Sequence, residues 1–232
     1  GGMNMNMVKQ AQKMQQDMLK MQEEMEQKAY EASAGGGGRG IRRIDREDQL
    51  EEQIEVAKEE AKKFFGNDEV YLEKLIVGPH HVEVQIIADA YGHVVALGER
   101  DCSMQRRNQK VLEEAPAYGI PRKLIDKLGS RCVEACKRIG YRGAGTFEFL
   151  YENGEFYFIE MNTRLQVEHA VSEEVSGIDI VKWQIRIAAG IPLDFTQEDI
   201  RLTGAAIECR VNATGCGTVD FLHVPGGPWV RF

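Results

Sequence analysis

Two apolar runs joined by Asn153-Gly154 constrain the fold of this chain more than any other feature. Residues 145–151 and 155–160 are rich in aromatic side chains, and each run has the length of a strand. Asn-Gly is a favoured pair for a two-residue turn, because both central positions of that turn need a positive φ. The sequence therefore predicts a β-hairpin in which the two runs are antiparallel partners.

Polar residues interrupt this apolar hairpin. Glu148 lies within the first run, Glu160 ends the second, and Asn162 follows two residues later. Two carboxylates and an amide oxygen that converge across a hairpin form an oxygen-only site, which suits a Mg²⁺ ion that bridges nucleotide phosphates. A solvated charged strand is the alternative, but it does not explain the apolar neighbours. We therefore predict that these three residues bind a metal ion.

The residues after the hairpin alternate in a second polar pattern. Arg164, Gln166 and Glu168 are spaced by two, so on an extended segment they would point to the same side. An arginine with a neighbouring amide and carboxylate offers a fork for a small planar anion and a base beside it. This segment is therefore predicted to bind an anionic substrate next to the metal.

The rest of the chain mixes predicted strands and helices. Strands are expected at 28–34, 41–44, 69–75, 81–89, 93–97 and 205–212, with a strand-like stretch at 218–223, and helices at 45–65, 121–139 and 178–190. Because several of the strands form hairpins, the pattern favours an α+β fold with a largely antiparallel sheet.

Length, charge and cysteine usage narrow the class of protein. The 232 residues fit one large domain or two small ones, and the net charge of −8 argues against a general affinity for nucleic acid. No apolar run approaches the roughly 18 residues that span a bilayer. Five cysteines without paired spacing fit a reducing cytosol. Cys132 and Cys136 lie four apart on a predicted helix, which favours buried thiols over a metal pair.

The first segment of the chain, residues 3–26, is rich in Met, Gln, Lys and Glu. An apolar heptad stripe runs along it, at Met7, Ala11, Met14, Met18, Met21 and Met25. One interpretation is a helix that packs on its own domain. The other is a helix that pairs with a copy of itself and so makes a homo-oligomer.

A glycine-rich run follows this segment. Its residues are Gly35, Gly36, Gly37, Gly38, Arg39 and Gly40. Such a run leaves backbone N–H groups free to surround phosphate oxygens, but it is equally common in linkers. The run alone leaves both interpretations open.

Residues 160–169 closely resemble the signature of biotin carboxylases and the related carbamoyl-phosphate synthetases. Four further motifs resemble the same family, at residues 35–40, 99–107, 141–149 and 208–212, and the resemblance is continuous from Ala32 to Asn212. It implies an ATP-grasp fold, with a lid subdomain and a larger antiparallel-sheet subdomain. It also implies ATP-dependent carboxylation of biotin, in which bicarbonate is activated as carboxyphosphate.

The resemblance implies a role for each matching residue. The glycine run would be a mobile lid over the phosphates of Mg-ATP or Mn-ATP. The remaining nucleotide contacts would come from Glu73, Lys74, Ile76, His81 and Gln105, and the metal ligands would be Glu148, Glu160 and Asn162. Lys110 would neutralise phosphate and carboxyphosphate, while Arg164, Gln166 and Val167 would seat bicarbonate. Glu168 would be the general base, and Arg210 would stabilise the biotin enolate.

Three departures from the family lead us to expect that activity is impaired or lost. We expect the family's N-terminal domain and its large C-terminal part to be missing, and the pattern breaks after Asn212. Glu31 stands where the family has an ATP-contacting lysine, so that a carboxylate would repel phosphate. A structural chimera without ligand function is therefore an alternative, and surfaces exposed by the truncation would be a second route to oligomers.

The front segment, from Val8 to Gly36, resembles a second family, the small nucleoid-associated proteins of the YbaB/EbfC kind, which bind DNA as dimers. A DNA-binding module is thus a further alternative. Together with the leading Gly1-Gly2, this resemblance favours an engineered chimera. The expected organisation is a Met-rich helix at 1–30, a lid subdomain at 31–75, a large subdomain at 76–212 and a C-terminal remnant at 213–232.

Overall fold

The computed structural model describes residues 32–34, 42–44, 46–106, 109–212, 215–218 and 220–232. The predicted Met-rich helix and the glycine run lie outside these residues. The strands are β1 (Ala32–Ala34), β2 (Arg42–Arg43), β3 (Glu73–Lys74), β4 (His80–Ala88), β5 (Val94–Arg106), β6 (Gln109–Ala115), β7 (Gly143–Glu152), β8 (Glu155–Asn162) and β9 (Ala206–Cys209). The helices are η1 (Glu47–Gln49), α2 (Leu50–Phe65), α3 (Arg122–Ile139), α4 (His169–Ser176), α5 (Ile180–Ala188) and η2 (Gln197–Asp199).

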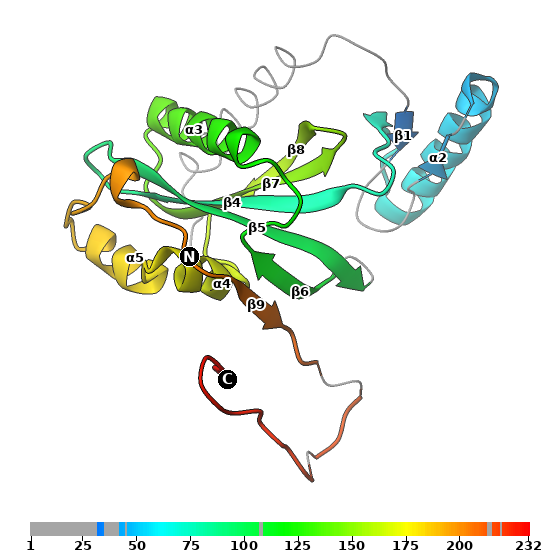
Figure 1. The fold of residues 1–232 in the computed structure, drawn as a ribbon. Helices are drawn as coiled ribbons and strands as arrows, with labels where there is room; N and C mark the ends of the chain where they lie inside the picture. Colours follow the sequence, from blue (N-terminus) through cyan, green and yellow to red (C-terminus); the bar gives the residue numbers. More distant parts are fainter. Residues whose placement is uncertain (1–31, 35–41, 45, 107–108, 213–214, 219) are drawn as a thin grey trace.

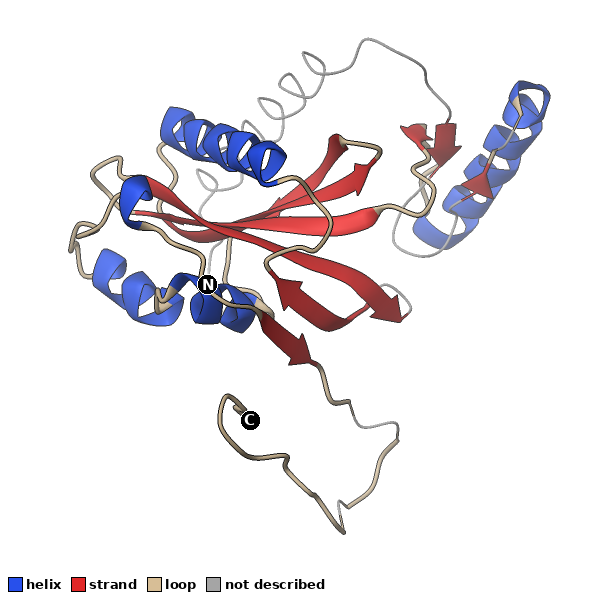
Figure 2. Ribbon diagram, viewed as in Figure 1, coloured by secondary structure: helices blue, strands red, loops and turns tan. Residues whose placement is uncertain are grey.

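A six-stranded antiparallel sheet forms the body of the molecule, with strand order β8-β7-β4-β5-β6-β9. Helix α3 covers one face of this sheet, and α4 and α5 cover the other (Figure 1). A second sheet, with order β2-β1-β3, lies with α2 at one end of the large sheet (Figure 2). Strands β1 and β2 are antiparallel partners on either side of the glycine run.

The central strand β4 is buried on both faces, and its alternating residues serve different purposes. Val82, Val84 and Ile86 belong to the apolar core under α3, which includes Leu128 of that helix. Glu83, Gln85 and Ile87 alternate with them and are also fully buried, so they point to the face of α4 and α5. Ile87 joins a second apolar core there, whereas Glu83 and Gln85 begin a polar cluster.

Helix α3 shows how local sequence sets an element. Ile125, Leu128, Cys132 and Cys136 recur at helical spacing and are buried against the sheet. The helix ends at Gly140, whose φ of 63° is in the left-handed region that glycine tolerates. The prediction of buried thiols is confirmed, and burial raises the pKa of Cys136 to about 12.

The predicted hairpin is confirmed, because Asn153 and Gly154 adopt φ values of 51° and 87° between β7 and β8. Other predictions need correction. Strand β3 is much shorter than 69–75, and β9 ends before 212. The predicted strand at 218–223 is wrong for its described residues, which extend away from the sheet without a neighbouring strand (Figure 1). Strand β6 and helix α4 were not predicted.

Among the helices within the described ranges, none combines the length and the apolar character needed to cross a bilayer.

Candidate functional site

A row of charged side chains crosses four adjacent strands on the sheet face under α4. Strand register places Glu160 opposite Glu148, Glu148 opposite Glu83, and Glu83 opposite Arg100. In the next row, Asn162, Thr146 and Gln85 lie side by side in the same way. Because every second residue of a strand points to one face, these two rows form a continuous polar surface.

Lys110 is the cation at the centre of this cluster. Its Nζ forms ion pairs with Glu83, with Glu148 Oε1 at 2.9 Å and with Glu168 Oε1 at 2.8 Å, and its side chain is only 16% exposed. Burial lowers the pKa of Lys110, but the facing carboxylates more than offset this effect and hold the pKa above its ordinary value. One ammonium group therefore joins three carboxylates that would otherwise repel one another.

His81 supplies a second cation. Its Nε2 lies 2.8 Å from Glu148 Oε2 and 3.2 Å from Glu83 Oε1. Burial lowers the pKa of His81, whereas hydrogen bonds to Glu148 and Glu83 raise it, and the result is a pKa of about 9. With His81 protonated at neutral pH, the cations Arg100, Lys110 and His81 balance the three carboxylates.

Arg100 is completely buried and makes five side-chain hydrogen bonds. Its Nε donates to Glu83 Oε2 at 2.7 Å. The two terminal nitrogens donate to side-chain oxygens on the other elements that meet here, at Gln85, Thr146, Gln166 and Ser172. The guanidinium thus connects β5 to β4, to β7, to the segment after β8 and to α4.

The segment after β8 departs from its predicted conformation. It is not extended throughout, because the chain turns at Val167 and Glu168, immediately before α4 begins at His169. Gln166 and Glu168 are buried in the cluster, whereas Val167 is 55% exposed. Arg164 is also exposed, and its guanidinium donates to the carbonyl of Leu165 at 3.1 Å. The turn places the Glu168 carboxylate beside Lys110, where it is buried.

The residues predicted to bind metal lie together, as the hairpin requires. Asn162 Nδ2 donates to Glu148 Oε1 at 2.8 Å and to Glu160 Oε1 at 3.1 Å. The amide thus occupies the position between two carboxylates that a cation would take, and an amide can turn its oxygen to that point. Two carboxylates and one amide oxygen are the donors that Mg²⁺ prefers, so these residues fit the ion. His81, Glu83 and Glu148 also have ligand atoms within 4.8 Å of one another, but a protonated imidazole suits Mg²⁺ poorly.

Several predicted nucleotide residues lie outside this cluster. Lys74 Nζ donates to the hydroxyl of Tyr157 at 2.9 Å and lies over its ring, and Gln105 donates to the carbonyl of Cys102. Glu73 is exposed and Ile76 is buried. Arg210 follows β9 and is exposed, with its backbone N–H bonded to the carbonyl of Val111. The structure therefore unites the predicted metal, lysine and base residues but leaves the two predicted substrate arginines on the surface.

Sequence reasoning did not identify Glu83, Gln85 and Arg100 as part of the site. The signal for the first two is the one used for the hairpin, since they alternate within the otherwise apolar run 82–88. Arg100 lies within the motif at 99–107, but that motif assigned it no role, because its partners are spread over four other segments of the chain.

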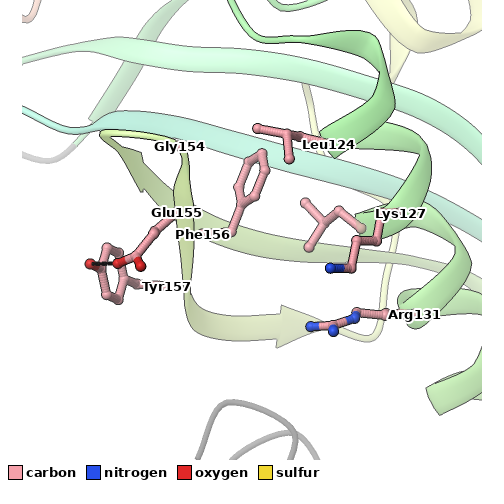
Figure 3. Close-up of a pocket in the computed structure, with 8 residues that line it drawn as sticks. Leu124, Lys127, Arg131, Gly154, Glu155, Phe156 and Tyr157 are labelled. Atoms are coloured by element: carbon pink, nitrogen blue, oxygen red, sulfur yellow. Dashed lines mark hydrogen bonds between the residues drawn. The ribbon is translucent and has the colours of Figure 1, made fainter. Parts of the chain in front are cut away.

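A pocket of about 110 Å³ lies on the opposite face of the sheet. It is formed between α3 and the tip of the β7–β8 hairpin, with Leu124 and Phe156 at its apolar side and Lys127 and Arg131 beside it (Figure 3). The polar cluster under α4 does not contribute to its lining. The chemistry-bearing residues and this cavity are therefore separate features.

A carboxylate pair adjoins the cluster on β6 and β9. Glu113 and Glu208 are direct cross-strand partners, and the Oε2 atom of each is buried without a hydrogen-bond partner among the described residues. Burial raises the pKa of Glu113 to about 7, with further contributions from Glu208 and Glu168. Burial also raises the pKa of Glu208.

Replacing Glu113 by glutamine is expected to remove a pH dependence of stability. A carboxyl whose folded pKa is raised binds its proton more tightly in the folded state, so its contribution is complete below pH 4.5 and is lost as the pH rises through about 7. Urea unfolding should show a loss of roughly 3 kcal/mol over this window in the wild type, and most of this loss should be absent from Glu113→Gln, which retains Glu208. The neighbouring Glu114→Gln is the control. An unchanged slope in Glu113→Gln would contradict the assignment.

These features define the class of the protein. A large antiparallel sheet that carries carboxylates, an amide and a lysine on one face, beside a smaller sheet, is an ATP-grasp fold of α+β class. The chain belongs to the family described as the carbamoyl-phosphate synthase L chain, ATP binding domain, whose profile matches residues 2–196. The matched range includes the front segment, so the second family resemblance proposed for that segment stays a prediction.

Within this family, the central part of the chain is of the biotin carboxylase type. The chain is 60% identical to biotin carboxylase of Haemophilus influenzae over 208 aligned residues. This alignment covers 87% of this chain and 46% of the relative. The biotin carboxylase domain dimer of Hydrogenobacter thermophilus 2-oxoglutarate carboxylase, in complex with MgADP, ADP and bicarbonate, is 52% identical, with a TM-score of 0.69 over 78% of this chain and 41% of that one.

A further solved structure, the β,γ-ATP complex of biotin carboxylase from Campylobacter jejuni, is 51% identical, with a TM-score of 0.69 over 78% of this chain and 42% of that one. The chain thus spans about half the length of the curated relatives it matches.

Proposed function

We propose that this chain binds Mg-ATP and that the protein it represents carboxylates biotin with bicarbonate. The observation that carries the proposal is the meeting of Glu148, Glu160 and Asn162 beside Lys110. Mg-ATP, when bound, supplies the phosphoryl group that activates bicarbonate. Two carboxylates and an amide would hold the ion, and the ammonium would face the phosphate charge.

The remaining roles concern protons and orientation. Glu168 is the base that takes the bicarbonate proton, and its place at the start of α4 next to Lys110 holds its carboxylate in the cluster. Gln166, Val167 and Arg164 would seat bicarbonate, and Arg210 would face biotin. Both arginines are exposed, so their guanidinium groups are accessible to substrates from solvent. Glu31 would oppose phosphate, so we infer that turnover is weak.

Thermal unfolding with and without millimolar Mg-ATP tests the proposal. A ligand at 100 times its dissociation constant adds about 2.7 kcal/mol of stability, which is a Tm shift of roughly 5–11 °C for a chain of this size. The double variant Glu148→Gln/Glu160→Gln should lose this shift, because two metal-ligand carboxylates are removed.

The matched control is Glu152→Gln/Glu155→Gln, which makes the same change on the same hairpin at the pair next to the turn. This control should keep the wild-type shift. No shift in the wild type would overturn nucleotide binding and favour a structural role. An equal shift in both double variants would move the metal site away from Glu148 and Glu160.

A further inference from the structure

The chemistry of Arg100 fixes the orientation of its partners. A guanidinium only donates hydrogen bonds, so every atom that faces it must be an acceptor. Arg100 Nη2 lies 2.9 Å from one end of the Gln166 amide, which must therefore be the oxygen. The other end, Nε2, then faces Glu148 Oε1 at 2.7 Å and donates to it. The orientation of Gln166 is thus set, and it supports the metal-ligand carboxylate rather than competing for the metal.

Asn162 differs in this respect. Its amide contacts the carboxylates of Glu148 and Glu160 only through Nδ2, and no guanidinium holds its oxygen in the contacts described. It can therefore turn its oxygen toward a cation, while Gln166 keeps donating to Glu148. Asn162 and Gln166 both donate to Glu148, but they have different functions because only Gln166 is bound to Arg100.

Arg100 also sets the orientation of Glu83. Its Nε binds Glu83 Oε2 at 2.7 Å, which leaves Oε1 directed to Lys110 and to His81. Lys110 and His81 in turn each contact one carboxylate oxygen of Glu148. Glu148 is consequently held by Gln166, Lys110 and His81, and Arg100 fixes the first of these directly and the other two through Glu83.

We propose that Arg100 is the positioning residue of the site, which holds Gln166 and Glu83 so that Glu148 is presented to the metal in one orientation. The inference rests on the proposed function for its link to nucleotide binding, but its geometric part does not. A residue that served only to fill the interior would need none of these specific bonds, since an apolar side chain of the same volume would serve.

Arg100→Lys is the test, because lysine keeps the charge beside Glu83 but cannot replace the five bonds of the guanidinium. Two measurements are made, on variants whose cooperative unfolding shows that they are folded. The first is the NMR spectrum of the Gln166 side-chain amide, assigned by its absence in Gln166→Met. The second is the dissociation constant for Mg-ATP from calorimetry.

In the wild type, the two Gln166 amide protons should be widely separated in chemical shift and slow to exchange with solvent. In Arg100→Lys they should collapse toward free-glutamine positions, and Mg-ATP binding should weaken roughly 5- to 10-fold, the effect of losing one oriented hydrogen bond. Ser172→Ala is the matched control. It removes one of the five bonds but neither of those to Glu83 and Gln166, so both readouts should stay at wild-type values.

A folded Arg100→Lys chain with the wild-type amide spectrum and affinity would overturn the proposal. If Arg100→Lys does not fold, the wild-type NMR spectrum alone still tests the positioning role. Gln166 amide protons that are averaged and exchange rapidly with solvent in the wild type would overturn the proposal. If the wild type does not bind Mg-ATP but its Gln166 amide is held and is released in Arg100→Lys, the proposed function fails and the positioning role stands.

Discussion

Glu83→Ala is expected to lower the free energy of unfolding by about 3–5 kcal/mol, the range for breaking a buried ion pair by removing one partner. Glu83 and Arg100 are both fully buried, and their ion pair measures 2.7 Å. Among the described residues, Glu83 is the one that forms an ion pair with Arg100. Without its carboxylate, the guanidinium remains buried and charged, because it cannot lose its proton. Equilibrium unfolding in urea measures the loss.

Glu160→Ala is the matched control for this prediction. It removes the same group from the same row of the sheet, two strands away, but Glu160 is exposed. Its stability should stay within about 0.5 kcal/mol of the wild type, as for most surface substitutions. A loss below about 1 kcal/mol in Glu83→Ala would show that the cluster does not contribute to folding as described.

Lys110→Met should cost about 2–4 kcal/mol at pH 8, somewhat less than a fully buried pair because the lysine is partly exposed. The methionine leaves Glu83, Glu148 and Glu168 close together without their shared cation. The pKa of Glu148 is subject to burial, which raises it, but His81 and Lys110 lower it below 4.5. Its contribution to stability is therefore present above pH 4.5 and lost as the pH falls through the folded pKa.

The deficit of Lys110→Met relative to the wild type should thus shrink only as the pH falls below 4.5, because protonated carboxyls no longer need the ammonium. Lys182→Met provides the comparison, since Lys182 is exposed on α5, outside the cluster. Its deficit should be small and nearly independent of pH over this range. A constant deficit in Lys110→Met would mean that its ion pairs have no role in the stability of the folded chain.

Local patterns predicted the parts of the site that are close in sequence. The turn at Asn153-Gly154 brings Glu148 opposite Glu160, so a segment of thirteen residues was enough to pair two of the proposed metal ligands. Glu168 came from the alternating polar pattern, whereas Lys110 and His81 entered through the family resemblance. The structure pairs Lys110 with Glu168, and both Lys110 and His81 contact Glu148. What sequence could not supply was the register between strands that are distant along the chain.

Strand β6 shows why some elements were missed. Its residues 109–115 contain four charged or amide side chains, so no clear apolar alternation marks it as a strand. Its pairing with β5 includes two register shifts, which place Lys110 opposite Gln105. The Glu113–Glu208 pair joins residues that are far apart in sequence, and it follows only from the pairing of β6 with β9. Helix α4 is eight residues long, too short for a clear helical period.

The two-sided burial of β4 has a consequence for how the chain folds. If this strand slipped by one residue against β5 and β7, the carboxylate of Glu83 would enter the apolar layer beside Phe147, and Val82 would face the guanidinium of Arg100. Each face penalises the slip independently, through an unpaired charge on one side and lost apolar contacts on the other. Misaligned hairpins of this strand therefore cannot compete with the native pairing during folding, and the residues proposed to serve the nucleotide also select the correct alignment of the sheet.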